Sequence, residues 1–187
     1  NANACTQTIV VKDSKAPTWT TPAMALDRLI DCDAIAALND AQALFPIATD
    51  NCDDDVTNIL KTSGTFVGNP NCPQGGTYTN TWTVTDACGN QSLVYTQIIT
   101  VQDTTKPTFT VPADITVYAD ANCQADTSIT VTGDVTNEMD NCGTMLNATS
   151  TDVIAAGTCT GNKVITRIWS LNDGCGNIVT KNQIITV

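Results

Sequence analysis

An internal repeat constrains the fold of this 187-residue chain more than any other feature. Four motifs recur in the same order about 90 residues apart. They are Asp13–Trp19 with Asp103–Phe109, Asp50–Cys52 with Asp140–Cys142, Trp82–Asn90 with Trp169–Asn177, and Gln97–Val101 with Gln183–Val187. The repeat divides the chain into residues 13–102 and 103–187. Residues 1–12 belong to neither repeat, and Ile9–Val11 aligns with Ile99–Val101, so we expect them to be the last strand of a preceding repeat in a longer tandem array.

Short alternating segments separated by turns predict an all-β fold for each repeat. Composition agrees, because threonine is abundant and Glu138 is the only glutamate beside 18 aspartates. The segment around Tyr78, Trp82 and Val84 places these three side chains on one face and threonines on the other. The second repeat shows the same pattern with Ile165, Trp169 and Leu171. Seven or so strands in about 90 residues are typical of the immunoglobulin fold, so we expect two tandem immunoglobulin-like β-sandwich domains.

The charge and composition exclude several classes of protein. The chain has no histidine, and its 8 basic residues against 19 acidic ones leave a net charge of −11. Catalysis by Ser-His-Asp or Cys-His groups is therefore excluded, and binding to nucleic acid or anionic membranes is disfavoured. No apolar run reaches the roughly 18 residues of a membrane span. The acidic residues recur at equivalent places in both repeats, which favours a scaffold over an enzyme, and we expect a monomeric, non-enzymatic segment.

Eight of the nine cysteines recur at equivalent positions in the two repeats. Zinc is disfavoured because the chain has neither histidine nor a C-x-x-C pair, whereas disulfides suit an oxidising compartment. Four cysteines allow three pairings. Cys72 and Cys88 flank one long strand, roughly 33 Å apart at the rise of a strand, and so cannot pair. The loop positions of an immunoglobulin-like sandwich then predict Cys32–Cys72, Cys52–Cys88, Cys123–Cys159 and Cys142–Cys175.

Cys5 has no equivalent in the complete repeats, whose last strands lack cysteine. We expect its partner to lie in the preceding repeat, with a functional free thiol as the alternative.

Three aspartate positions recur in both repeats, in the linker before each repeat and in two of its loops. In a sandwich these places lie at the same end of the domain, where three carboxylates repel one another unless a cation lies among them. Oxygen ligands from separate loops suit Ca²⁺. The sequence therefore predicts one calcium site per repeat, formed by Asp13, Asp50, Asn51 and Asp86, and by Asp103, Asp140, Asn141 and Asp173.

Turn formation by the same aspartates is the alternative to metal binding. The acidic run Asp53–Asp55 occurs only in the first repeat. If both calcium sites exist, this run predicts tighter binding at the first site.

The motifs Asp-Thr-Thr-Lys-Pro, Asp-Asn-Cys, Trp-x-x-x-Asp-x-Cys-Gly-Asn and Gln-Ile-Ile-Thr-Val resemble those of the HYR-like, immunoglobulin-fold repeats of giant Bacteroidetes cell-surface adhesins, including the gliding-motility adhesin of flavobacteria. The resemblance implies a secreted, extracellular stalk or adhesin segment at the cell surface. Its partners would be neighbouring repeats and, outside the chain, a surface polysaccharide or a solid substratum. The alternatives are a carbohydrate-binding module and a spacer in a secreted multidomain enzyme.

Overall fold

The computed structural model describes residues 5–143, 146–157 and 162–187. Strands joined by turns dominate, so the all-β prediction is confirmed. The chain divides into two compact units. Unit 1 comprises Asn1–Ile30, Ala36–Val67 and Thr77–Thr100, and unit 2 comprises Asp31–Ile35, Gly68–Gly76 and Val101–Val187. The units differ from the two sequence repeats, because segments 31–35 and 68–76 of the first repeat belong to unit 2.

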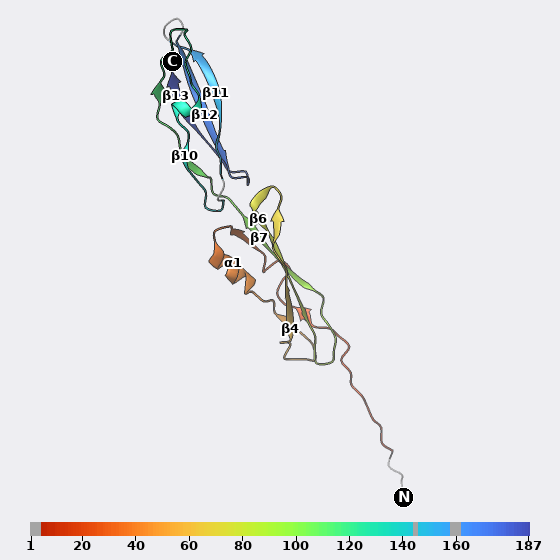
Figure 1. The fold of residues 1–187 in the computed structure, drawn as a ribbon. Helices are drawn as coiled ribbons and strands as arrows, with labels where there is room; N and C mark the ends of the chain where they lie inside the picture. Colours follow the sequence, from red (N-terminus) through yellow and green to blue (C-terminus); the bar gives the residue numbers. More distant parts are fainter. Residues whose placement is uncertain (1–4, 144–145, 158–161) are drawn as a thin grey trace. The chain divides into compact units, whose positions relative to one another are not determined.

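The first repeat forms a large sheet and a small one (Figure 1). The large sheet has the strand order β2-β7-β6-β4, with β5 also paired to β6. Its strands are β2 (Arg28–Asp31), β4 (Ile59–Ser63), β5 (Val67–Asn69), β6 (Cys72–Val84) and β7 (Tyr95–Gln102). The small sheet pairs β1 (Thr18–Trp19) with β3 (Ala48–Thr49) in antiparallel fashion.

The second repeat has the same arrangement of strands. Its large sheet has the order β11-β12-β13-β9, and its small sheet pairs β8 with β10. The strands are β8 (Thr108–Thr110), β9 (Ile115–Thr116), β10 (Thr136–Met139), β11 (Thr149–Ala156), β12 (Lys163–Asn172) and β13 (Ile178–Thr186). Figure 1 shows β11, β12 and β13 side by side. The equivalent order in the two repeats means that equivalent loops occupy equivalent places.

The core of each repeat lies between its large and small sheets. In the first repeat Trp82 of β6 is 1% exposed and packs with Tyr95 and Leu26. In the second repeat Trp169 of β12 packs against Phe109 of β8. Each such buried aromatic side chain contributes roughly 1.5–3 kcal/mol. The alternation predicted for these two strands is confirmed.

Two helices interrupt the strands and were not predicted from the sequence. They are α1 (Ile35–Gln42) and the single-turn α2 (Ile129–Thr132). The α1 segment, Ile-Ala-Ala-Leu-Asn-Asp-Ala-Gln, contains three alanines, a leucine and a glutamine, which favour the helix. Within the described residues, neither helix is long and apolar enough to cross a membrane.

A buried glutamine in each repeat fastens the large sheet to the rest of its core. Gln97 of β7 is fully buried, and its Nε2 donates to the carbonyl oxygens of Leu26 (2.6 Å) and Ala41 (3.1 Å). The equivalent Gln183 of β13 is also fully buried and donates to the carbonyl of Thr132 (2.7 Å). Because a buried polar group must be hydrogen-bonded, these bonds explain why glutamine begins the repeated Gln-Ile-Ile-Thr-Val motif.

Candidate metal centres and disulfide bridges

Two triads of aspartates bring their carboxylates together, one in each compact unit. One carboxylate oxygen from each member lies within 4.8 Å of the others. The triads are Asp13, Asp50 and Asp86 in unit 1, and Asp103, Asp140 and Asp173 in unit 2. The grouping expected from the repeat is therefore observed, while cation binding at the triads stays a prediction.

The repeated Asp-x-Cys-Gly-Asn turn holds the third aspartate of each triad. Asp86 Oδ1 accepts hydrogen bonds from the backbone N–H groups of Cys88 (2.9 Å) and Asn90 (2.7 Å). Asn90 Nδ2 donates to Asp86 Oδ2 (2.7 Å) and to the carbonyl of Asp13 (3.4 Å), which ties the turn to the linker. Gly89 has φ +89°, a conformation that favours glycine. The same bonds and the same positive φ recur in unit 2 at Asp173, Cys175, Gly176 and Asn177.

The same bonds keep the turn aspartate of unit 1 ionised. Burial alone would raise the pKa of Asp86, but hydrogen bonds from Asn90, Cys88 and Gly89 lower it below its usual value. Asn90 and Asn177 therefore position the triads, a role that the sequence analysis missed. The repeated Cys-Gly-Asn motif carried the signal that could have identified them.

The second aspartate of each triad has one oxygen bonded to its own loop and one oxygen free. Asp50 Oδ1 accepts from the backbone N–H groups of Cys52 (2.9 Å) and Asp53 (3.2 Å). Asp140 Oδ2 accepts from those of Cys142 (3.0 Å) and Gly143 (3.1 Å). Among the described residues, the buried Asp50 Oδ2 and Asp140 Oδ1 have no hydrogen-bond partner. Turn formation thus uses only one oxygen of each carboxylate.

Asp103 is the most enclosed linker aspartate, being only 7% exposed. Its Oδ1 accepts from the backbone N–H of Thr105 (3.1 Å), and its buried Oδ2 has no partner within the described part of the chain. Burial raises the pKa of Asp103, and repulsion from Asp140, Asp173 and Asp31 acts in the same direction. A buried carboxylate oxygen without a donor is costly, and a bound cation would remove that cost.

Asp31 joins the neighbourhood of the unit 2 triad, although the sequence analysis did not select it. One ligand atom from each of Asp31, Cys32, Asp103 and Cys142 lies within 4.8 Å of the others. Asp31 Oδ2 accepts from the Thr104 hydroxyl (2.7 Å). The repeat alignment could not reveal Asp31, because the residue before the equivalent cysteine in the second repeat is asparagine.

The remaining predicted ligands are less enclosed. Asn51 and Asn141 are exposed, and Asn51 Nδ2 donates to Cys52 Sγ (2.8 Å). In the acidic run of the first repeat, Asp53 uses both oxygens in local bonds, since Oδ1 accepts from the N–H of Asp55 (3.1 Å) and Oδ2 from that of Ala87 (3.0 Å). Asp53 therefore adds little free carboxylate to the first triad.

Two disulfides join the two sequence repeats. Cys32 pairs with Cys142 and Cys72 pairs with Cys175, with Cα–Cα distances of 5.9 and 4.1 Å. The predicted pairs Cys32–Cys72 and Cys142–Cys175 are therefore wrong. The physical reason is that segments 31–35 and 68–76 belong to unit 2. Their cysteines meet the Asp-Asn-Cys and Cys-Gly-Asn loops of the second repeat, whereas the prediction considered only pairs within one repeat.

The other described cysteines are unpaired. Cys52 and Cys88 are free and exposed, so the predicted bridge between them is also wrong. Their loops are equivalent to those that receive Cys32 and Cys72 in unit 2, so their counterparts Cys142 and Cys175 also bridge to other loops and not to each other. Cys5 is likewise free and exposed. Cys159 lies outside the described residues, and the pairing of Cys123 with it stays a prediction.

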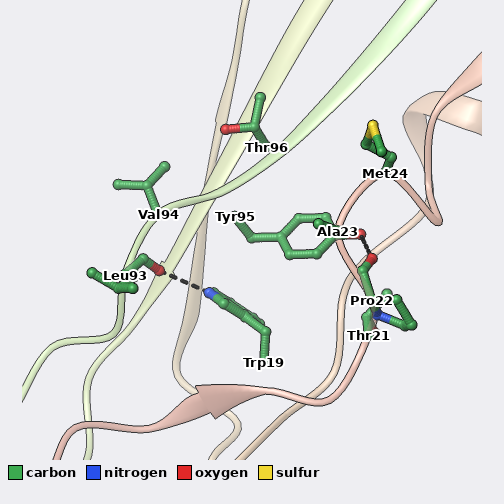
Figure 2. A pocket seen from close by; sticks show the side chains of 9 residues that line it. All are labelled: Trp19, Thr21, Pro22, Ala23, Met24, Leu93, Val94, Tyr95 and Thr96. Carbon is green, nitrogen blue, oxygen red and sulfur yellow. Dashed lines mark hydrogen bonds between the residues drawn. The ribbon is translucent and has the colours of Figure 1, made fainter.

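An open pocket of about 470 Å³ in unit 1 is lined by Trp19, Tyr95 and the exposed Met24, Leu93 and Val94, among others. Figure 2 shows that the polar groups of its two aromatic residues are already used. Trp19 Nε1 donates to the Leu93 carbonyl (2.7 Å), and the Tyr95 hydroxyl lies 2.7 Å from the Pro22 carbonyl. The two rings meet edge to face, with centroids 5.6 Å apart. They pack against each other and do not form the flat exposed platform typical of a glycan site.

Comparison with known protein families gives a match over part of the chain. Residues 22–101 match the HYR-like domain with 4 cysteines. This part of the chain is therefore similar to HYR-like domains. The match spans Cys32, Cys52, Cys72 and Cys88, and the internal repeat extends the same motifs to the second half of the chain. HYR-like domains occur in extracellular and cell-surface adhesion-type proteins and are not an enzyme family. A search of curated proteins finds no match.

Proposed function

We propose that the chain is a tandem module of a secreted cell-surface adhesin or filament. It consists of two immunoglobulin-like sandwiches that act as a load-bearing stalk in adhesion or gliding motility. The observation that carries this proposal is the pair of disulfides between the repeats, Cys32–Cys142 and Cys72–Cys175. The occurrence of HYR-like domains in adhesion-type proteins supports it.

The disulfides give the stalk a covalent route for tension. When the two ends of the chain are pulled, force passes through the Cys32–Cys142 bridge, or along residues 32–72 and through the Cys72–Cys175 bridge, so the segment between Cys32 and Cys142 cannot extend fully. The sequence separation of this bridge is 110 residues. At about 3.3–3.6 Å per extended residue, the bridge shortens the fully extended chain by roughly 360–400 Å. A stalk that resists lengthening in this way suits a surface under shear.

Calcium at the two triads is the second part of the proposal. Unpartnered, buried oxygens of Asp103 and Asp140 in unit 2, and of Asp50 in unit 1, are the hard ligands that Ca²⁺ prefers. A calcium ion neutralises the repulsion within each triad, and Asn51 and Asn141 supply further oxygens. Because each triad takes its members from a linker and two loops, the ion stiffens the entry of the chain into its domain.

Single-molecule pulling of the oxidised and the reduced chain tests the stalk. We expect reduction to lengthen the fully extended chain by roughly 360–400 Å, the length protected by the Cys32–Cys142 bridge. A variant with serine at all four bridged positions should show the long extension without reductant. The matched variant Cys52→Ser/Cys88→Ser, which changes only free cysteines, should keep the short one. Equal extension before and after reduction would contradict the load-bearing role.

A further inference from the structure

Unit 1 carries two unpaired cysteines at places that are bridged in unit 2. The repeat aligns Cys52 with Cys142 through Asp-Asn-Cys, and Cys88 with Cys175 through Asp-x-Cys-Gly-Asn. Cys142 and Cys175 form disulfides, whereas Cys52 and Cys88 are free and exposed. Equivalent cysteines in one chain therefore differ in whether a partner cysteine is present.

The backbone around the free cysteines already has the bridged arrangement. In the first loop, the Cys52 N–H donates to Asp50 Oδ1 at 2.9 Å, and the bridged Cys142 N–H donates to an Asp140 oxygen at 3.0 Å. In the second loop, the N–H groups of Cys88 and Cys175 donate to Asp86 Oδ1 and Asp173 Oδ1 at 2.9 and 2.7 Å. The backbone hydrogen bonds that hold the bridged loops of unit 2 are thus already formed in the two loops of unit 1.

The partner cysteines of unit 2 arrive on two segments of the preceding repeat. Segment 31–35 brings Cys32, and segment 68–76 brings Cys72; both belong to unit 2. Unit 1 contains only the tail Asn1–Lys12 and parts of the first repeat, so within the described residues it has no equivalent incoming segments. Two equivalent segments from another repeat would supply the partners that Cys52 and Cys88 lack among the described residues.

We propose that Cys52 and Cys88 are the receiving half of a two-disulfide joint, and that their partner is another repeat of this kind whose cysteines are equivalent to Cys32 and Cys72. This proposal extends the tandem arrangement proposed above by naming the partner and the joining atoms. Repeated along an array, it makes every joint doubly cross-linked. Cys123 aligns with Cys32 and is exposed, so the proposal makes it a donor for the next joint in place of the predicted Cys123–Cys159 pair.

The joining chemistry requires an oxidant. Each bridge forms between two thiol sulfurs with loss of two protons and two electrons. A small disulfide such as oxidised glutathione accepts them by thiol–disulfide exchange and leaves as two molecules of the reduced thiol. Such conditions exist outside the cytoplasm, where HYR-like domains occur.

Two glycines of the unit 2 loops that face the incoming segments are replaced in unit 1 by residues with side chains, and the test allows for this. A Cβ built at Gly143 would lie 2.9 Å from Gln74 Nε2, and one at Gly174 would lie 3.4 Å from Pro73 Cδ. The equivalent positions in the first repeat are Asp53 and Ala87. An incoming repeat identical to the first one therefore meets two extra side chains, of which the first faces only the flexible end of a glutamine.

An extended version of the chain tests the joint. A second copy of residues 13–102 replaces residues 1–12, and a site for a sequence-specific protease is inserted between the exposed Lys15 and Ala16 of the receiving repeat. The protein is oxidised in glutathione buffer, cleaved, and examined by non-reducing electrophoresis and by mass after thiol alkylation. We expect two more disulfides than in the 187-residue chain. The two cleaved pieces should separate only when reductant is added.

Matched substitutions distinguish the joint from other pairings. Cys52→Ser/Cys88→Ser in the receiving repeat should release the pieces without reductant, whereas the same pair in the added copy should leave them joined. A second extended chain with Asp53→Gly/Ala87→Gly in the receiving repeat removes these two side chains and gives the loops the two glycines of unit 2. Separation without reductant in both extended chains, or a Cys52–Cys88 disulfide, would overturn the proposal. The pulling experiment does not depend on these cysteines, so its outcome is independent.

Discussion

At the scale of single residues, the Asp103 carboxylate lies in an unfavourable electrostatic environment. It is 7% exposed, its Oδ2 has no partner within the described part of the chain, and Asp140, Asp173 and Asp31 repel it. No charged group of opposite sign lies among its described hydrogen-bond partners. Asp31 also increases the negative charge near this triad, whereas Asp53 of the first repeat is occupied by backbone bonds. If the triads bind calcium, we therefore expect tighter binding in unit 2, the reverse of the order expected from the acidic run.

Replacing Asp103 by asparagine should change stability in opposite directions with and without calcium. In chelator we expect the Asp103→Asn chain to melt at a higher temperature, because one of four mutually repelling acids is removed. When calcium is added, it should stabilise the Asp103→Asn chain less than the native chain. The affinity of this site for calcium should fall by at least about tenfold, or about 1.4 kcal/mol. Calorimetric titration and thermal denaturation measure both effects.

The control for this substitution is Asp40→Asn, an exposed aspartate on α1 that belongs to neither triad. It should leave calcium binding unchanged. Identical melting temperatures of the native chain in calcium and in chelator would contradict the metal sites and leave turn formation as the role of the aspartates.

At the scale of secondary-structure elements, the two repeats fill one place in the sheet with different polar pairs. In the first repeat Asn80 of β6 lies opposite Ser63 of β4, and in the second Arg167 of β12 lies opposite Asp152 of β11. Arg167 is 5% exposed, and its guanidinium bonds Asp152 at 2.8 Å. It also donates to Thr132 Oγ1 of α2 at 2.6 Å. The ion pair thus joins two strands and a helix.

The Arg167–Asp152 pair should make the second repeat sensitive to acid. Hydrogen bonding to Arg167 lowers the pKa of Asp152 below its usual 3.8 despite partial burial. Its stabilisation is therefore fully present above pH 3.8 and is lost as the pH falls through the lower folded-state pKa. At neutral pH, Asp152→Asn should cost about 2–3 kcal/mol, less than for a fully buried pair because Asp152 is partly exposed.

Denaturant unfolding between pH 2 and 7 measures this effect, which should shrink at the acid end. The double variant Asp152→Ser/Arg167→Asn, which copies the pair of the first repeat, should recover part of the lost stability because it leaves no unpaired buried charge. A cost for Asp152→Asn that does not change with pH would contradict the assignment.

At the scale of the whole molecule, two overlapping covalent loops close most of the chain. The bridges span sequence separations of 110 and 103 residues, and together they connect the first repeat to the second. Closing a long loop mainly lowers the entropy of the unfolded chain, typically by 2–4 kcal/mol in free energy. The two loops share most of their residues, so the second bridge adds less than the first.

Removal of one bridge should therefore be tolerated better than removal of both. We expect Cys32→Ser/Cys142→Ser to lower the free energy of unfolding by about 2 kcal/mol, and loss of both bridges to lower it by about 2–4 kcal/mol. Cys5→Ser, which changes an exposed free cysteine outside any strand, serves as the control. The measurement is denaturant unfolding in an oxidising buffer, and equal stability of all four chains would contradict the role of the bridges.

The local elements and the aspartate triads could be predicted because motifs that recur in both repeats occupy equivalent places in the fold. Trp82 alternates with threonines, and Trp169 shares its face with Ile165 and Leu171. Burial of that face follows directly from the period of a strand. The triads followed from three repeated loop positions at one end of a sandwich. Helix α1 was missed because its alanine-rich segment has no counterpart in the expected immunoglobulin pattern, and Asp31 was missed because it is not repeated.

The sequence by itself determined the two repeats, the all-β class, the core strands and the six aspartates that gather in triads. All of these depend on local periodicity or on order along the chain. The tertiary structure alone decided that Cys32 and Cys72 leave their own repeat and bridge to Cys142 and Cys175. Disulfide pairing depends on which Cα atoms come within about 7 Å. That distance is set by how segments 31–35 and 68–76 pack in unit 2, which cysteine spacing along the chain does not encode.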